Sequence, residues 1–309
     1  MDFTASSPSH DLQVLVKGEK MQLSVNGTVI SSDRIHKATL PGTSNDPNDP
    51  KYKKRILCEG DSWFSLSSLP SSNMLFPLTF AEPTILYNLA FPGDTIIEMS
   101  DMAKNPDLIK NICDPNFAVK WDLIFLSGGG NDLMNRADKV LCRPSDGAGQ
   151  QMLDYVNHIE LSLLKSDIQK AYSAIARLRQ QSGSKNQETP IVTHIYDYPT
   201  PRNASAKFLT FGIAGPWLHK AFKAHEIPEP LWISLSDYLY EFLAETIIDL
   251  KNQIPNFHVI SNTRETLIRA KLRETGESGD WENEIHPTTK GYEKLSGIVS
   301  PELYHLLYP

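Results

Sequence analysis

The sequence predicts an α/β fold in which helices cover both faces of a parallel sheet, with a small β-rich appendage at the amino end. Two observations support this. From Arg55 onward, apolar strand-like runs alternate with segments of helical periodicity, an order typical of parallel strands joined through helices. The first 52 residues instead show short alternating runs separated by turn signals. We therefore divide the chain into an N-terminal β-rich extension with its linker, residues 1–52, and a main domain, residues 53–309.

The amino-terminal extension has the pattern of short antiparallel strands. In LQVLVKGEKMQLSVNGTVIS, apolar and polar residues alternate around Lys17-Gly18 and Asn26-Gly27, and such dipeptides favour tight hairpin turns. The segment PGTSNDPNDPKYKK that follows is rich in Pro, Asn, Asp and Ser, which is typical of a linker or a surface loop. These features predict no role for the extension.

The main domain contains several apolar runs of strand length. The run WDLIFLS, Trp121 to Ser127, is apolar almost throughout, as expected of a strand covered on both faces. The other runs that we read as strands are RILC, TILYNLA, PIVTHIYDY and NFHVISN.

Helical segments separate these runs. Residues Gln150 to Gln181 place apolar side chains at three- and four-residue steps, which predicts one long helix. Three further segments, DTIIEMSDMA, LWISLSDYLYEFLAETIIDLKNQI and TTKGYEKLSGIVSPELYHLLY, are also expected to be helical. The stretch Thr200 to Pro230 is long, aromatic and interrupted by Gly and Pro; it is either a lid or pocket wall, or an irregular structural excursion.

Composition excludes several classes of function. The formal net charge of −7 argues against nucleic acid as a partner, since phosphates require a basic surface. The three cysteines, Cys58, Cys113 and Cys142, show no CxxC spacing, so we expect neither a zinc site nor a disulfide framework. We also expect no cofactor. No secretory signal and no apolar stretch of membrane-spanning length is visible, so we expect a cytoplasmic protein without an integral membrane segment, although export without a cleaved signal stays open.

Small and polar residues follow the strand-like runs in four places. These blocks are GDSW, NLAFPGDT, LSGGGND and, near the carboxyl end, DWENEIHPTTKGY. In a parallel α/β sheet, the loops at the carboxyl ends of the strands build the site. Each block also has a simpler reading as a turn or a helix cap, but their joint occurrence after successive strands favours a site.

The residue types in these blocks suit acyl transfer. A serine nucleophile needs a base within hydrogen-bond distance, and Ser62 and His286 are the candidates. A tetrahedral intermediate needs donors aimed at its oxyanion. The Ser62 amide, the Gly93 amide and the Asn131 side chain are the candidate donors. Alternatively, Asn131 caps a helix, Gly93 belongs to a plain turn and His286 lies on the surface.

The four blocks resemble the motifs of the SGNH or GDSL hydrolases. The resemblance covers GDS at Gly60 to Ser62, NLAFPG ending at Gly93, GGND at Gly129 to Asp132, and His286-Pro287. It implies a three-layer α/β/α domain with a central parallel sheet and no metal. It also implies that Ser62 is the nucleophile, that His286 is the base, and that Ser62, Gly93 and Asn131 form the oxyanion hole. The first 52 residues lie outside the resemblance.

One position departs from the family pattern. The family usually carries Asp three residues before the histidine, and this chain has Asn283 there. The group that orients His286 is therefore open: Asn283 itself, a backbone carbonyl, or one of the nearby acids Asp280, Glu282 and Glu284.

These observations predict a serine esterase that cleaves a small-molecule carboxylic ester through an acyl-enzyme on Ser62. Lipid-like, aryl and acetyl-sugar esters are the expected substrate classes, with Trp63, Phe64 and the segment Phe208 to Trp217 as candidate walls of an apolar acyl pocket. Two alternatives remain: an acyltransferase to a sugar hydroxyl, and an inactive ligand-binding module on the same fold. A metal-dependent hydrolase is disfavoured because no His/Asp/Glu cluster has ligand spacing.

Overall fold

The computed structural model describes residues 46–65, 73–144, 151–208 and 212–309, together with five short strands in the amino-terminal part. These strands are β1 (Thr4–Ser7), β2 (His10–Lys17), β3 (Lys20–Val25), β4 (Thr28–Ser31) and β5 (His36–Ala38). The predicted turn residues Gly18, Asn26 and Gly27, and the beginning of the predicted linker, residues 41–45, lie outside the described residues.

A six-stranded sheet forms the centre of the molecule, in the order β12-β9-β8-β6-β7-β5. The first five of these strands run parallel, and β5 is antiparallel to β7. All five predicted strands of the main domain are present, although four of them, all except β6, are shorter than the apolar runs in which they lie. Their bounds are β6 (Lys54–Gly60), β7 (Thr84–Asn88), β8 (Leu123–Ser127), β9 (Ile191–His194) and β12 (Phe257–Ile260).

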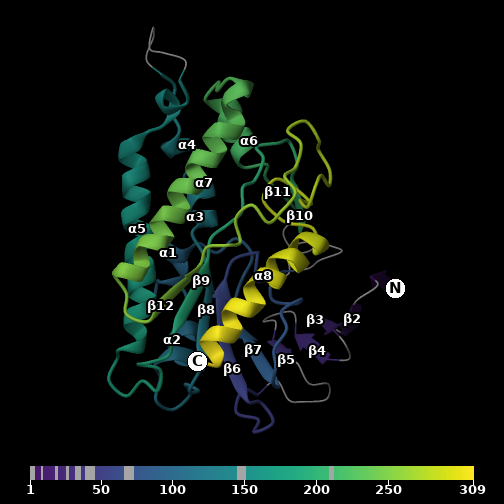
Figure 1. The fold of residues 1–309 in the computed structure, drawn as a ribbon, viewed down its shortest axis with the longest axis vertical. Helices are drawn as coiled ribbons and strands as arrows, with labels where there is room; N and C mark the ends of the chain where they lie inside the picture. Colours follow the sequence, from purple (N-terminus) through teal and green to yellow (C-terminus); the bar gives the residue numbers. More distant parts are fainter. Residues whose placement is uncertain are drawn as a thin grey trace.

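Helices cover both faces of this sheet, which confirms the predicted three-layer α/β/α architecture. Helix α8 (Thr289–Leu307) crosses one face and α5 (His158–Arg179) lies on the other (Figure 1). The remaining helices are α1 (Ile96–Met99), α2 (Pro106–Ile112), α3 (Gly130–Asn135), α4 (Ala137–Val140), α6 (Leu218–Ala224) and α7 (Trp232–Ile248). Short 3-10 turns occupy Met152–Tyr155, Glu229–Leu231 and Asp249–Asn252.

The long helix begins later than its apolar periodicity indicates. The sequence predicts helix from Gln150, but α5 starts at His158. The reason is local: the Asn157 side chain accepts the Glu160 amide as an N-cap, and the preceding residues form a 3-10 turn. A capping asparagine sets a helix start more strongly than apolar spacing does.

The amino-terminal strands β1 to β4 form an antiparallel sheet in sequential order, as their alternating pattern predicts. The pairing of β5 with β7 is a feature that the sequence analysis did not predict, because three residues are too few to show a period. This strand makes the extension contribute an edge to the central sheet. The proposed boundary at residue 52 stays a prediction.

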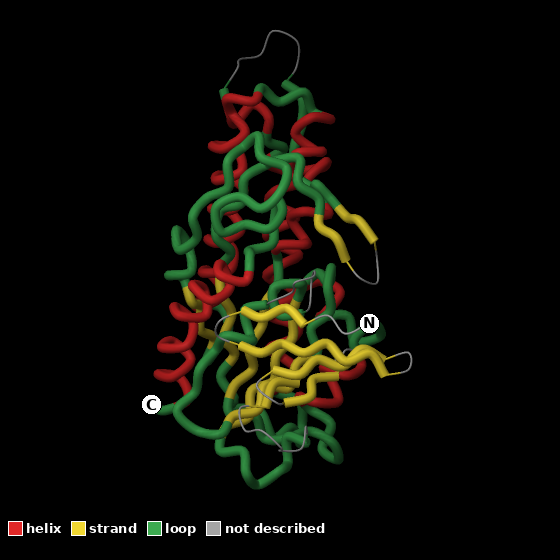
Figure 2. The backbone as a smooth tube through the Cα atoms, turned by 90° about the vertical axis from the view of Figure 1, so that its right-hand side faces the viewer, coloured by secondary structure: helices red, strands yellow, loops and turns green. Residues whose placement is uncertain are grey.

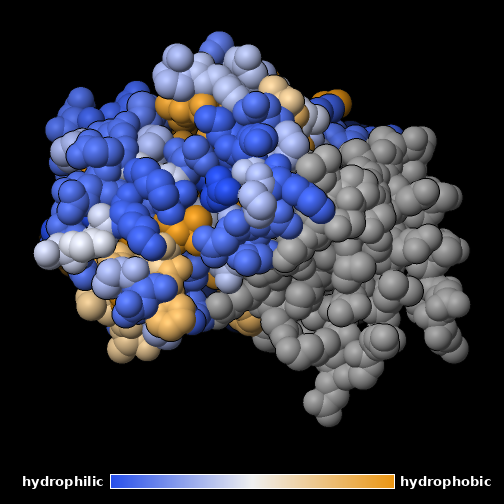
Figure 3. Space-filling model, turned by 90° about the horizontal axis from the view of Figure 1, so that it is seen from below, coloured by the Kyte–Doolittle hydropathy of each residue, from blue (hydrophilic) through white to orange (hydrophobic). Residues whose placement is uncertain are grey.

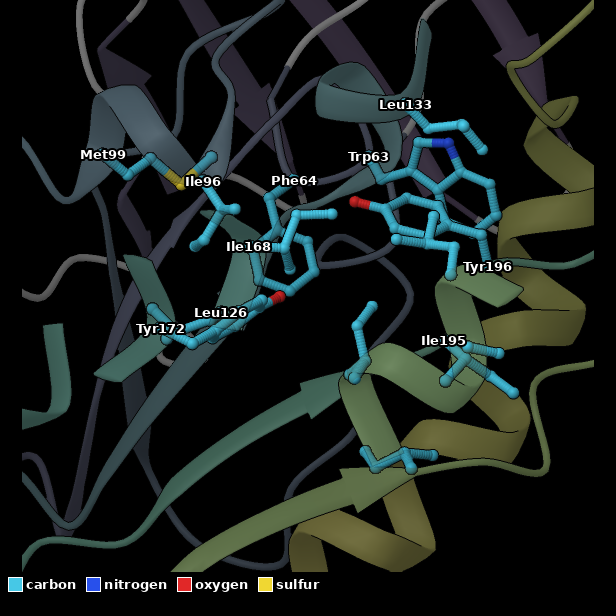
Figure 4. Packing of buried hydrophobic residues seen from close by; sticks show 14 of the residues in the cluster. Trp63, Phe64, Ile96, Met99, Leu126, Leu133, Ile168, Tyr172, Ile195 and Tyr196 are labelled. Atoms are coloured by element: carbon cyan, nitrogen blue, oxygen red, sulfur yellow. The ribbon is translucent and has the colours of Figure 1, made fainter. Parts of the chain in front are cut away.

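The core lies between the sheet and its helices. Every residue of β8 is buried, and its side chains alternate between the two faces. Phe125 packs against Phe64, with ring centroids 4.5 Å apart, and Figure 4 shows Phe64, Leu126, Ile168 and Tyr172 as members of one buried cluster. Strands buried on both faces explain why the apolar runs are continuous.

The surface carries a projecting hairpin and a mostly hydrophilic face. Figure 2 shows that a hairpin of β10 (Ala206–Phe208) and β11 (Gly212–Ala214) projects from the body of the molecule. The face seen from below is mostly hydrophilic where residues are described, with only small apolar patches (Figure 3). Within the described ranges, no helix has the length and apolar character that a membrane span requires.

Candidate active site

Ser62 lies in the turn that follows β6. The strand passes so close to β8 that a Cβ on Gly60 would lie 2.8 Å from Ser127 Cβ, and only glycine fits there. The Asp61 carboxylate then accepts the Trp63 amide at 3.0 Å, an Asx turn that bends the chain around Ser62. Ser62 is 3% exposed. The close approach of β6 to β8 therefore requires Gly60, and the turn around Ser62 requires the side chain of Asp61.

His286 approaches Ser62 from the loop before α8. Its Nε2 lies 2.7 Å from Ser62 Oγ, although the two residues are 224 positions apart in the chain. Thr288 caps α8 by accepting the Gly291 amide. A Cβ on Gly291 would lie 2.6 Å from the Asp280 carbonyl oxygen, so glycine allows the helix to begin close against the histidine loop.

The other ring nitrogen of His286 is held by Asn283. Nδ1 lies 3.0 Å from Asn283 Oδ1, and the same oxygen accepts the backbone amides of Ile285 and His286 at 3.1 and 3.0 Å. Two backbone N–H donors require an acceptor, so the oxygen of the Asn283 amide must face them. Nδ1 of His286 then carries its hydrogen and donates it, which leaves Nε2 free to accept the proton of Ser62.

Two of the three candidate acids bind elsewhere. Asp280 accepts Lys294 Nζ at 2.5 Å and the Ile268 amide at 2.6 Å. Glu284 accepts backbone amides at the start of α6, from Trp217, Leu218 and His219. The backbone amide of Glu282 donates to the His286 carbonyl oxygen at 2.9 Å, which closes the histidine loop.

Burial decides the charge of the imidazole. His286 is 1% exposed, and this burial lowers its pKa to about 4, because the charged form is poorly solvated there. The ring is therefore neutral at neutral pH and able to take up a proton. Burial also raises the pKa of Glu284 to about 7, against the effect of its backbone donors, which lower it.

Asn131 bonds to the loop after β7 that contains Gly93, through the neighbouring residue Asp94. Asn131 lies in the first turn of α3, and its Nδ2 donates to the Asp94 carbonyl oxygen at 3.0 Å. This bond uses one amide hydrogen and leaves the other for a ligand. Gly93 has φ +93°, a conformation that favours glycine, and it is exposed. The Phe91 amide donates to the Gly60 carbonyl oxygen at 3.0 Å, which joins this loop to the end of β6.

The aromatic residues after Ser62 do not line a pocket. Trp63 and Phe64 are buried, and the Trp63 ring packs against rings that include Tyr196, Trp281 and Tyr292. The expectation that they wall an acyl pocket is therefore wrong. They follow a turn that directs them back into the core, and aromatic residues bury large areas there.

The segment Thr200 to Pro230 contributes the aromatic residue beside the histidine. Trp217 is half-buried, and its ring centroid lies 6.1 Å from that of His286 in a T-shaped arrangement. The segment holds the β10–β11 hairpin and α6, and Glu284 ties the start of α6 to the histidine loop. Residues 209–211 of the predicted pocket segment lie outside the described residues.

The polar residues behind Ser62 are not among the site residues that the sequence predicts. Tyr196 follows β9, and its hydroxyl donates to Asp61 Oδ2 at 2.5 Å. It lies inside the run PIVTHIYDY, whose apolar character predicts only a buried strand. Tyr196 is a polar residue at the carboxyl end of a strand, where sites in parallel sheets are built. Its position is therefore the feature of the sequence that could have identified it.

No metal centre is indicated in the part of the chain that the structure describes. Within it, His, Cys, Asp and Glu side chains form no group of three or more that could hold a metal ion. Cys58 and Cys113 are buried free thiols, and burial raises the pKa of each. This makes them poor nucleophiles at neutral pH.

Comparison with known proteins finds similarity among solved structures. No family model matches the chain, and no curated protein matches it. An aryl esterase of M. smegmatis has 13% identity and a TM-score of 0.41, over 82% of this chain and 99% of the other. A carbohydrate acetylesterase family member from Sinorhizobium meliloti has 13% identity and a TM-score of 0.46, over 82% and 99%.

The acetylxylan esterase Axe2 from Geobacillus stearothermophilus has 10% identity and a TM-score of 0.40, over 84% of this chain and 95% of the other.

Proposed function

We propose that this chain is a serine hydrolase that cleaves small-molecule carboxylic esters through an acyl-enzyme on Ser62. The observation that supports this most strongly is the row of three groups: Ser62 Oγ lies 2.7 Å from His286 Nε2, and Nδ1 of the same ring lies 3.0 Å from Asn283 Oδ1. A nucleophile, a base and a group that orients the base are what nucleophilic acyl transfer requires.

In the proposed reaction, Ser62 Oγ attacks the ester carbonyl carbon as His286 Nε2 takes its proton. The carbonyl oxygen becomes an oxyanion, which the amides of Ser62 and Gly93 and the second hydrogen of the Asn131 amide stabilise. The imidazolium then gives its proton to the departing alcohol as the C–O bond breaks. Water repeats these steps on the acyl-enzyme and releases the acid.

The buried imidazole suits this task. A histidine that stays neutral at neutral pH is available as a base, and the fixed Asn283 oxygen supports the imidazolium that forms during the reaction. Trp217 beside His286 offers an apolar surface to an acyl or aryl group, which supports lipid-like or aryl esters among the expected classes.

Turnover of p-nitrophenyl acetate tests the proposal. Ser62→Ala should lower kcat by about three or more orders of magnitude while the protein stays folded. Ser296→Ala is the matched control, because it removes another buried hydroxyl, which lies in α8 and bonds to the carbonyl oxygens of Met74 and of Tyr292. Ser62→Ala activity within about tenfold of the control would exclude Ser62 as the nucleophile.

A further inference from the structure

A cluster of buried polar side chains lies behind the proposed nucleophile. Its members are Asp61, Ser127, His194 and Tyr196, each at most 4% exposed. They come from the ends of three neighbouring strands, β6, β8 and β9. Polar side chains at such depth are costly unless they are paired, so their partners indicate what the cluster does.

The Asp61 carboxylate is the centre of this cluster. Its Oδ2 accepts the Tyr196 hydroxyl at 2.5 Å. Its Oδ1 accepts the Ser127 hydroxyl at 2.9 Å and the Trp63 amide at 3.0 Å. Asp61 and Trp63 flank Ser62 in the chain, so the bond between them spans the nucleophile. The direction of the carboxylate therefore sets the conformation of the turn that carries Ser62.

We propose that Tyr196 is a positioning residue for Ser62: its hydroxyl holds the Asp61 carboxylate, and through it the turn that presents Ser62 Oγ to His286 Nε2. This inference rests on the proposed serine hydrolase function and adds to it a residue that touches neither substrate nor base.

The packing of the Tyr196 ring supports this role. The ring lies beside the Trp63 indole (Figure 4) and meets it edge-on, with ring centroids 4.9 Å apart. A Cβ on Gly130 would lie 3.0 Å from Cζ of Tyr196, so the same ring also contacts the start of α3, one residue before Asn131. Tyr196 thus connects the nucleophile turn with the helix that carries a proposed oxyanion donor.

Electrostatics gives the hydroxyl a second effect on the same carboxylate. Burial raises the pKa of Asp61 to about 6, while the bonds from Tyr196, Trp63 and Ser127 lower it. Burial and the neighbouring Asp61 raise the pKa of Tyr196 itself, so its hydroxyl keeps the hydrogen that it donates. Loss of this donor favours a protonated Asp61, whose hold on the Trp63 amide is weaker.

The test compares Tyr196→Phe with Tyr172→Phe in the full chain, using a fluorophosphonate probe. Both variants keep the ring and delete one buried hydroxyl; that of Tyr172 donates to the Gly128 carbonyl oxygen at 2.8 Å and does not touch Asp61. We expect the maximal labelling rate of Tyr196→Phe to fall about 10- to 100-fold, since small displacements of a nucleophile are costly. The probe concentration at half-maximal rate should change less than about threefold.

Thermal unfolding separates positioning from stability. Both variants lose a buried hydrogen bond and should show similar decreases in Tm, so a rate loss confined to Tyr196→Phe is not a folding defect. Equal labelling rates for the two variants would overturn the positioning role. If Tyr196→Phe does not fold, Ser127→Ala replaces it, because it removes another donor to Asp61. A labelling rate of Ser127→Ala equal to that of Tyr172→Phe would then overturn the positioning role.

The wild-type protein in the same assay separates the two proposals. A wild type that is folded but not labelled contradicts the proposed function itself. A wild type labelled at Ser62, with Tyr196→Phe equal to Tyr172→Phe, contradicts only the positioning role.

Discussion

At the scale of single residues, the amide of Asn283 explains how a neutral side chain can hold the histidine. An asparagine in this role can flip, and its NH₂ group would then favour the wrong tautomer of the ring. Here the backbone amides of Ile285 and His286 bind the oxygen and exclude the flip. The backbone of the loop thus ensures that Asn283 presents only an acceptor to His286, as a carboxylate would, and so selects the same tautomer of the ring.

Asn283→Asp should change the pH dependence of the reaction. In the wild type, the decrease in kcat/KM that comes from protonation of His286 should lie near pH 4, below any decrease that comes from Asp61, whose pKa is about 6. A carboxylate facing Nδ1 stabilises the imidazolium and raises the pKa of His286, so the acid limb should move up by about one unit or more. Activity at pH 8 should be retained, because Asp can accept the same three donors.

A pH–rate profile of kcat/KM on p-nitrophenyl acetate measures this shift. An acid limb that stays in place in the Asp variant would show that Asn283 does not face the ring during catalysis. Asn135→Asp, on the exposed end of α3, is the control for a general effect of added charge.

The site residues differ in how far the sequence could predict them. Ser62, Gly93, Asn131 and His286 were identified because each follows a strand or precedes a helix, and the structure brings Ser62 within hydrogen-bond distance of His286. The partner of His286 could not be chosen, since that depends on which backbone amides face the Asn283 oxygen. Trp63 was misjudged because its burial follows from the direction of the turn, which composition does not show.

At the scale of elements, Glu284 joins the histidine loop to α6. Its carboxylate accepts the amides of Leu218 at 3.1 Å and of His219 at 2.7 Å, and it also accepts the Trp217 amide. These amides have no acceptor within a helix start. The long segment Thr200 to Pro230, whose role the sequence left open, is thereby fixed next to the site.

Glu284→Gln should loosen this junction. Gln offers one acceptor oxygen where the carboxylate offers two, and its NH₂ would face a backbone donor. We expect the free energy of unfolding to fall by about 1–3 kcal/mol, and the amides of Trp217 to His219 to exchange faster with solvent. Denaturant unfolding and amide hydrogen exchange measure the two effects.

Glu277→Gln is the matched control for this experiment, since Glu277 is exposed. Unchanged protection of the α6 amides in Glu284→Gln would mean that the helix start is held by its other contacts.

The bounds of helices also depend on local hydrogen bonds. Apolar spacing predicted helix α5, but the residue at which it starts is set by the Asn157 cap.

At the scale of the whole molecule, the α/β class was predictable and the strand order was not. Alternation of strands and helices indicates parallel pairing, but nothing local says that β6 lies between β7 and β8. The edge strand β5 could not be predicted from the sequence, because its partner β7 lies about 50 residues away along the chain. Pairing at such distance leaves no periodic trace in a three-residue strand.

Truncation tests how the extension relates to the main domain. All proposed site residues follow residue 60, so a chain without residues 1–31, which lacks β1 to β4, should turn over p-nitrophenyl acetate within about threefold of the full chain. A chain without residues 1–45 also lacks β5 and exposes the edge of β7, so it should aggregate more readily. Light scattering and p-nitrophenyl acetate turnover measure both outcomes, and loss of activity in the first truncation would mean that the β1–β4 sheet supports the site.

Labelling with a fluorophosphonate, followed by peptide mapping, tests the central claim most directly. The probe forms a stable bond only with an activated nucleophile, so it reports the Ser62–His286 pair independently of the natural ester. We predict one label per chain on the peptide that contains Ser62, its loss in Ser62→Ala, and much slower labelling in His286→Ala. A folded protein that takes up no label, or one labelled at another residue while Ser62→Ala keeps its turnover, would contradict the account.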